Sequence, residues 1–204
     1  MERITIIFGT VMGTAEGCAN KISDRLIDCK LDNEVVDMAE YDHARLTENN
    51  LLIVVTSTTG NGVPPGNAEA LHAFLSEGKV DLNGRAFAVL SLGDSFRTHF
   101  AQCGKDFDRM LEELGGTRVI NRIDTDGVVE APLKEFINDL LNYLEKETDL
   151  YPAFVRTEEP KQAPPKSSEK KNSTDNTAES KSTKKKGILS RIIRRVVNKI
   201  RKFL

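Results

Sequence analysis

The sequence predicts an α/β domain built on a doubly wound, five-stranded parallel sheet, followed by a linker and a C-terminal amphipathic helix. Short β-branched runs alternate with longer segments of helical periodicity up to Tyr151, and parallel strands need such helical crossovers. After Tyr151 the chain is rich in Pro, Ser, Thr, Lys and Glu, and large apolar residues become rare until the last segment. These two patterns distinguish a folded body, residues 1–151, from a tail.

The first half of the body is expected to supply three strands and two helices. The strands are apolar runs at 3–8, 35–36 and 51–56, which suit a sheet that is buried on both faces. A loop is expected at 57–67 from its Gly, Pro and Asn content, and a helix at 68–77 follows it. The segment at about 14–30 is expected to be helical because its apolar residues share one face: Ala15, Cys18, Ala19, Ile22, Leu26 and Ile27.

The second half continues the same alternation. A strand at 85–92 leads into a second polar loop, and a helix at 103–114 ends at the Gly115-Gly116 pair. A fifth strand is expected at 117–123, and the last helix of the body at 131–147. The pattern is therefore βα repeated five times, with helices on both faces of the sheet.

The net charge of −2 hides a strong asymmetry. Residues 1–151 carry 14 Lys+Arg against 26 Asp+Glu, a net charge of −12, whereas residues 152–204 carry 15 against 5, a net charge of +10. An acidic body with a basic tail implies different partners for the two parts.

Several classes of protein are excluded or disfavoured. No apolar run approaches about 18 residues, so we expect no membrane-spanning helix, and the N-terminus has no apolar stretch long enough for a secretory signal. Cys18, Cys29 and Cys103 lack metal-ligand spacing, and their odd number does not suggest a disulfide framework. We therefore expect a reducing cytoplasm. A response-regulator receiver would need acids where this chain has Gly9-Thr10 and Thr56-Ser57.

Three loops are candidates for ligand binding because ligands of doubly wound sheets bind outside the carboxyl ends of the strands. They span residues 9–15, 56–70 and 91–105. The small and hydroxyl residues of the first loop let backbone amides approach a phosphate at a helix N-terminus, although the loop matches neither a P-loop nor GxGxxG. A plain strand-to-helix turn with an N-cap is the alternative for that loop.

The three loops contain the segments GTVMGTAE, STTGNGVPPGNA and GDSFRTHF. Together, in this order and spacing, they resemble the flavodoxin-like family. The likeness extends to the FMN domain of diflavin reductases and to short free-standing flavodoxins of the MioC kind. It covers about residues 1–148 and implies a flavodoxin-like fold with FMN as cofactor.

The resemblance also implies which residues surround FMN, and they form three groups. The phosphate group contains Thr10, Val11, Met12, Gly13, Thr14 and Ala15. One side of the ring is lined by Thr58, Thr59, Gly60, Asn61 and Gly62. The other side is lined by Leu92, Gly93, Asp94, Phe96, Arg97, His99 and Phe100.

The sequence departs from the family at the flavin ring. Thr59 and Arg97 stand where such proteins usually carry an aromatic side chain, which leaves Phe96, or the guanidinium of Arg97, to stack on the ring. Two lost stacking contacts of about 0.5–1.5 kcal/mol each predict FMN binding that is weaker by about tenfold to a hundredfold. The alternative is a flavin-free docking module with the same fold.

The tail is expected to have two parts. Residues 152–186 form a disordered linker, and residues 187–204 form a basic amphipathic helix with apolar residues at i, i+1, i+4 and i+5. Such a helix favours the surface of an anionic membrane. Docking on a protein partner or on the acidic body, and contact with nucleic acid, are alternatives. The contact residues would be Ile188, Leu189, Arg191, Ile192, Ile193, Arg194, Arg195, Val196, Val197, Lys199, Ile200, Arg201, Lys202, Phe203 and Leu204.

The function that the resemblance implies is FMN-dependent electron transfer. The resemblance implies a redox carrier rather than a complete oxidoreductase, reduced by a separate reductase and delivering electrons to another protein. The tail would hold this carrier at the cytoplasmic surface of the inner membrane.

Overall fold

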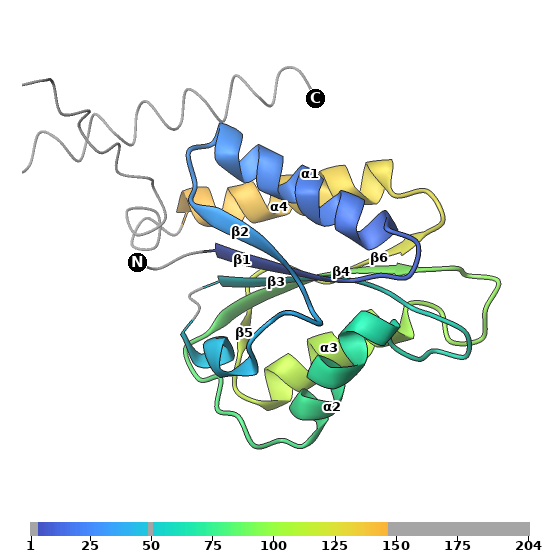
Figure 1. The fold of residues 1–204 in the computed structure, drawn as a ribbon. Coiled ribbons are helices and arrows are strands. Elements are labelled where there is room, and N and C mark those ends of the chain that lie inside the picture. The colour runs from blue at the N-terminus through green and yellow to red at the C-terminus, as the bar shows by residue number, and fades with distance from the viewer. Residues whose placement is uncertain (1–3, 49–50, 147–204) are drawn as a thin grey trace, which may run out of the picture. The chain divides into compact units, whose positions relative to one another are not determined.

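The computed structural model describes residues 4–48 and 51–146, which fold as a parallel sheet between two layers of helices (Figure 1). The strands are β1 (Ile4–Gly9), β2 (Asn33–Asp37), β3 (Leu51–Ser57), β4 (Ala86–Gly93), β5 (Thr117–Arg118) and β6 (Ile123–Asp126). The α-helices are α1 (Thr14–Asp28), α2 (Glu69–Ser76), α3 (Gln102–Glu113) and α4 (Glu130–Lys146), and two short 3₁₀ helices are η1 (His43–Thr47) and η2 (Gly66–Ala68). The strand order is β2-β1-β3-β4-β5, and all the pairings are parallel.

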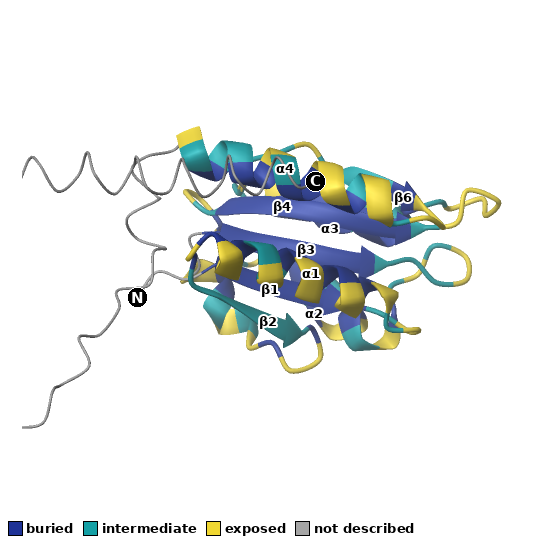
Figure 2. Ribbon diagram, turned by 90° about the horizontal axis from the view of Figure 1, so that it is seen from above, coloured by how far each residue is buried: buried dark blue, intermediate teal, exposed yellow. Residues whose placement is uncertain are grey.

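Helices cover both faces of the sheet, as the sequence predicts. Helices α1 and α4 lie on one face and helices α2 and α3 on the other (Figure 1). Strands β1, β3 and β4 are buried along nearly their whole length, so they read as continuous apolar runs (Figure 2). Alternate residues pack on opposite layers. Ile7, Val54 and Val89, for example, join Phe107 and Leu111 of α3 in one buried cluster.

The fifth strand differs from its expected course. It is not continuous over 117–123 but divides into β5 and β6, which pair with the beginning and the end of β4 respectively. The amide of Val119 still donates to the carbonyl of Phe87 in β4, at 2.9 Å, and residues 120–122 then leave the ladder. The side chain of Arg122 bonds there to Asp108 on α3 and to Asp124. The two pieces together occupy one strand position at the edge of the sheet, so the topology remains the predicted one.

One helix of the expected fivefold βα repeat is replaced. Strand β2 is followed by the 3₁₀ helix η1 instead of an α-helix. Asp42 begins this turn, and its carboxylate accepts a hydrogen bond from the amide of Ala44 at 3.0 Å. Among the described residues no helix is both long and apolar enough to cross a membrane. Cys18, Cys29 and Cys103 are buried free thiols. The expected linker, 152–186, and tail helix, 187–204, lie outside the described residues.

Candidate functional site

Four loops gather at the carboxyl edge of the sheet. They follow β1, β3, β4 and β6, and the parallel pairing of these strands brings them to one side (Figure 2). The second and third loops are joined directly. The amide of Thr58 donates to the carbonyl of Leu92 at 2.9 Å, and the hydroxyl of Thr58 accepts from the amide of Cys103 at 3.1 Å. The loops that the sequence singles out therefore form one surface.

The first loop turns tightly into α1. Gly13 precedes the helix with a left-handed φ of 81°, and its amide donates to the hydroxyl of Thr10 at 3.0 Å. The side chain of Ala15 is buried, so this residue offers only its backbone to a ligand. Four backbone amides of the loop find no acceptor within the described chain: those of Val11, Met12, Thr14 and Ala15. A helix N-terminus with free amides is a suitable site for an anion.

The second loop is stabilised by its own hydrogen bonds. The hydroxyl of Thr59 donates to the carbonyl of Val63 at 3.0 Å, and the backbones of the same two residues form an isolated antiparallel bridge. Gly62 has a φ of 94°, and a Cβ there would lie 2.7 Å from Cβ of His99 in the third loop. Glycine is therefore required where the two loops touch, and the hydroxyl of Thr59 serves its own loop.

The third loop presents the exposed aromatic ring of the site. Phe96 is 97% exposed, and its amide donates to the carboxylate of Asp94 at 3.0 Å. Arg97 is also exposed, and its Nε lies 3.6 Å from a carboxylate oxygen of Asp94. Phe100, by contrast, is half-buried, with the ammonium of Lys105 5.3 Å from the centre of its ring. Leu92, also expected to line the ring, has a buried side chain and can contribute only its backbone.

Exposed apolar side chains are concentrated at this edge. Six large apolar residues are exposed among those that the structure describes, and only Ile27 on α1 lies away from the four loops. The other five are Val11, Met12, Val63, Phe96 and Val128. Because folded proteins rarely leave such groups together in water, this edge has the composition of a binding surface.

Two candidate site residues were not predicted from the sequence. Asn67, in the loop after β3, accepts a hydrogen bond from the amide of Thr10 at 2.9 Å. Asp126, at the end of β6, accepts from the amide of Ser95 at 2.8 Å. Asn67 stands inside the second loop motif, which was a usable signal. Asp126 had only the Asp-Gly turn at 126–127 to mark it.

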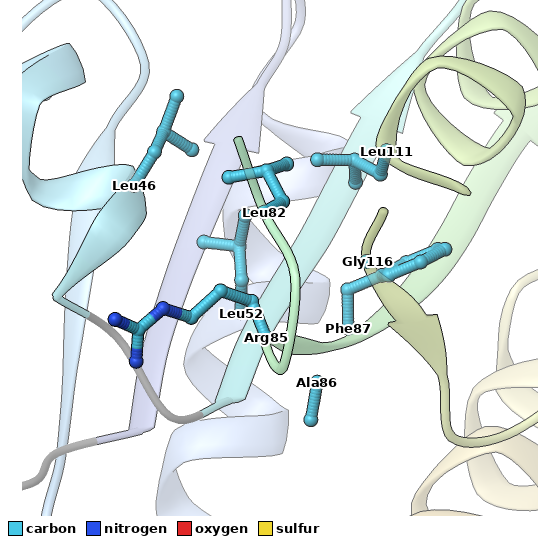
Figure 3. Close-up of a pocket in the computed structure, with 8 residues that line it drawn as sticks. All are labelled: Leu46, Leu52, Leu82, Arg85, Ala86, Phe87, Leu111 and Gly116. Atoms are coloured by element: carbon cyan, nitrogen blue, oxygen red, sulfur yellow. The ribbon is translucent and has the colours of Figure 1, made fainter. Parts of the chain in front are cut away.

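The opposite edge of the sheet carries a small hollow of another character (Figure 3). Its lining comes from η1, α3, the beginnings of β3 and β4, and the connections that precede β4 and follow α3. Apart from Arg85 its lining is apolar or glycine, and the residues are Leu46, Leu52, Leu82, Arg85, Ala86, Phe87, Leu111 and Gly116. None of these lining residues carries a side-chain hydroxyl, in contrast to the loops at the carboxyl edge.

A five-position parallel sheet with a phosphate-type turn after β1 and two facing loops after β3 and β4 defines a flavodoxin-type protein. The family model for flavodoxin matches residues 6–138, and the chain therefore belongs to the flavodoxin family. This confirms the resemblance, the fold and, at the level of the family, the cofactor, because flavodoxins bind FMN.

Similar proteins of two kinds accompany this assignment. The chain is 44% identical over 137 residues to the flavoprotein alpha-component of sulfite reductase [NADPH] from Shigella flexneri and from Escherichia coli K12. The match takes in 67% of this chain and 23% of those relatives. A flavodoxin of Streptococcus pneumonia TIGR4 superposes with a TM-score of 0.64 at 26% identity, covering 71% of this chain and 99% of that one. A C101A mutant of a Pseudomonas aeruginosa flavodoxin gives a TM-score of 0.58 at 29% identity, covering 68% and 99%.

Proposed function

We propose that this chain is an electron-transfer protein that holds FMN among the loops at the carboxyl edge of its sheet. The observation that carries the proposal is the coincidence, at one edge, of unpaired backbone amides with exposed apolar side chains. The amides suit the phosphate, and the apolar side chains suit the ring. When bound, FMN supplies one- and two-electron redox chemistry that no side chain provides.

The first loop fits a phosphate. With the left-handed turn at Gly13 and the bond from its amide to Thr10, the amides on either side find no acceptor among residues 4–48 and 51–146. The exposed hydroxyl of Thr14 adds a further donor at the helix N-terminus. The donors of this loop therefore suit a phosphate dianion, although the loop contains no lysine.

The ring would rely on fewer aromatic contacts than usual. Phe96 is free to move onto a ligand because water surrounds 97% of it. Among the residues that the structure describes, the guanidinium of Arg97 pairs only with Asp94, and it can be laid on a ring face. Thr59 has no aromatic surface to offer, which supports weaker binding of the ring.

Reconstitution of the full chain tests the cofactor. The purified protein is incubated with excess FMN, desalted, and examined for visible absorption and for flavin fluorescence. We expect yellow protein that is bleached by dithionite and reoxidised by cytochrome c. A colourless protein after desalting, with no change of FMN fluorescence on titration, would favour the flavin-free docking module instead.

We also propose that separate proteins donate and accept the electrons. The similarity to the flavoprotein component of a sulfite reductase supports this, because such a component exchanges electrons with other redox groups. The acidic charge of the body suits basic partners. NADPH alone should leave the bound flavin oxidised. Addition of a catalytic amount of a flavodoxin reductase to the same mixture should reduce the flavin with electrons from NADPH. Rapid reduction by NADPH alone would contradict this proposal.

We further propose a cytoplasmic protein whose residues 187–204 bind anionic membranes. This rests on the sequence alone, because the segment lies outside the described residues. The full chain should co-sediment with vesicles that contain phosphatidylglycerol and not with pure phosphatidylcholine vesicles. A variant with Ile192→Glu and Val196→Glu should stay in the supernatant. Equal sedimentation of both proteins would refute the membrane role and leave partner docking.

A further inference from the structure

Asn67 joins three segments that are far apart in the sequence. It lies in η2, after β3, and its amide oxygen accepts a hydrogen bond from the amide of Thr10 at 2.9 Å. Its amide nitrogen donates to a carboxylate oxygen of Asp37 at 3.0 Å and to the carbonyl of Phe8 at 3.5 Å. The side chain thus links the ends of β1 and β2 with the beginning of the first loop.

Asp37 determines which way this amide points. A carboxylate only accepts hydrogen bonds, so the nitrogen of Asn67 must face Asp37 and its oxygen must face Thr10. The same oxygen of Asp37 also accepts from the amide of Ala39 at 2.8 Å, which holds the carboxylate in place. The pair therefore gives the oxygen of Asn67 one direction.

The close packing beneath the loop leaves little freedom. A Cβ at Gly9 would lie 2.8 Å from Cβ of Ala68 and 3.0 Å from the hydroxyl oxygen of Thr56. The end of β1 consequently sits directly against the segment that carries Asn67. A shift of the Asn67 side chain would be transmitted to the backbone of the loop.

The hydrogen bond that Asn67 accepts also determines which amides of the loop are free. It engages the amide of Thr10, and the hydroxyl of Thr10 engages the amide of Gly13. These two bonds fix both ends of the turn at 10–13. The amides that remain without an acceptor in the described chain are the ones available to a phosphate.

We propose that Asn67, oriented by Asp37, is a positioning residue that sets the first loop for the phosphate of the flavin nucleotide. The proposal rests on the proposed function. It assigns Asn67 no contact with the ligand, because its oxygen is directed at Thr10. It also predicts that the effect of Asn67 is confined to the phosphate end of the ligand.

The test compares two ligands that differ only in the phosphate, FMN and riboflavin, by fluorescence titration of the full chain. Asn67→Ala should raise the Kd for FMN by about tenfold to thirtyfold, since it frees the Thr10 amide and loosens the turn. The Kd for riboflavin should change by less than about twofold, because the ring loops are untouched. Asp37→Ala, which spares the bond to Thr10, should raise the Kd for FMN by about threefold to tenfold. It should add nothing in the Asn67→Ala background.

Asn33→Ala is the matched control. Its amide oxygen accepts from Ser23 at 2.7 Å and its nitrogen donates to the carbonyl of Leu31 at 3.1 Å, at the other end of β2. This variant should leave both Kd values unchanged. The inference would be overturned if Asn67→Ala lost affinity for FMN and for riboflavin equally, or lost affinity for neither. In either case the proposed function would stand, provided that the native chain binds FMN. A native chain that binds neither flavin would overturn both.

Discussion

Asp126 holds Ser95 by two hydrogen bonds across 31 residues of sequence: the amide of Ser95 donates to one carboxylate oxygen at 2.8 Å, and its hydroxyl donates to the other. The contact joins the end of β6 to the loop after β4. Because both bonds favour the charged form, they lower the pKa of Asp126, with the hydroxyl of Ser95 as the larger cause. The carboxylate is therefore an anchor for the loop that presents Phe96.

Asp126→Ala should release this loop. With both acceptors lost, the amide of Ser95 is expected to exchange with solvent about tenfold faster, which NMR hydrogen exchange measures. In the native protein the anchor depends on pH. Its folded pKa is below the ordinary 3.8, so its contribution is complete above about pH 5 and is lost as the pH falls through the lowered value. Exchange at Ser95 that is equal in the variant and in the native protein at pH 7 would show that the anchor is ineffective.

A second carboxylate links α3 to the divided fifth strand. Asp108, which is 7% exposed, accepts from Nε of Arg118 at 2.7 Å and from Nη1 of Arg122 at 2.6 Å. The two arginines also pair with Glu112 and Asp124. Asp108→Ala should lower the free energy of unfolding by about 2 kcal/mol. This loss is smaller than for a fully buried ion pair. The side chains of both arginines are about one quarter exposed, so water can solvate them when the carboxylate is removed.

Urea unfolding followed by circular dichroism measures this difference. Lys79→Ala, which removes an exposed ion pair with Glu77 at 2.9 Å, is the control and should cost less than about 0.5 kcal/mol. Similar losses in the two variants would mean that the buried carboxylate contributes no more than a surface pair.

The strands and loops of this protein could be predicted from the sequence, whereas the side-chain hydrogen bonds between distant segments could not. Strands such as 51–56 and the loops after them were predictable, because continuous apolar runs and dense Gly, Pro and Asn are local patterns. The hydrogen bonds that the amide of Thr10 donates to Asn67 and the amide of Ser95 donates to Asp126 were not predictable. Each joins two residues that are far apart in the sequence, by 57 and by 31 positions respectively. The same holds for the bond from Arg122 to Asp108, which lies where the expected fifth strand is divided into β5 and β6.

Helix α3 approaches β4 so closely that Gly104 admits no side chain. A Cβ at Gly104 would lie 2.1 Å from the hydroxyl oxygen of Ser91 and 2.2 Å from its Cβ. Gly104→Ala should therefore displace α3 and destabilise the protein by about 3 kcal/mol or more, as judged by thermal and urea unfolding.

Gly17 in α1 gives the opposite expectation for the same substitution. Nothing lies within 4 Å of a Cβ placed there, and its backbone is helical. Gly17→Ala should stabilise the protein by about 0.5–1 kcal/mol through helix propensity. If the two variants changed stability in the same direction, the close contact at Ser91 would not be the cause.

The three thiols should be unreactive in the folded protein. Burial raises the pKa of Cys103 to about 12, although the hydroxyl of Thr56 opposes this, and burial also raises the pKa of Cys18. At pH 8 only about one Cys103 in ten thousand would be a thiolate, which is the reactive form. Ellman's reagent should therefore label the native chain slowly and label all three thiols at once in denaturant. Fast labelling under native conditions would reveal local opening around α3 or α1.

Arg97 and Asp94 should change the potential of the bound flavin in opposite directions. They form a surface pair in the loop proposed to line the ring, and reduction adds negative charge there. Arg97→Ala leaves the carboxylate unbalanced and should lower the midpoint potential by about 20–45 mV. This range corresponds to about 0.5–1 kcal/mol for a one-electron step at an exposed site.

Asp94→Asn should raise the midpoint potential by a similar amount, because the remaining charge of the pair is positive. Arg109→Ala on α3, which removes a pair with Glu113 at 2.9 Å, should leave the potential unchanged. Spectroelectrochemical titration of the reconstituted full chain measures all three. Shifts of the same sign for Arg97→Ala and Asp94→Asn would place the effect in the conformation of the loop, whereas opposite signs require that the flavin lie within reach of both charges.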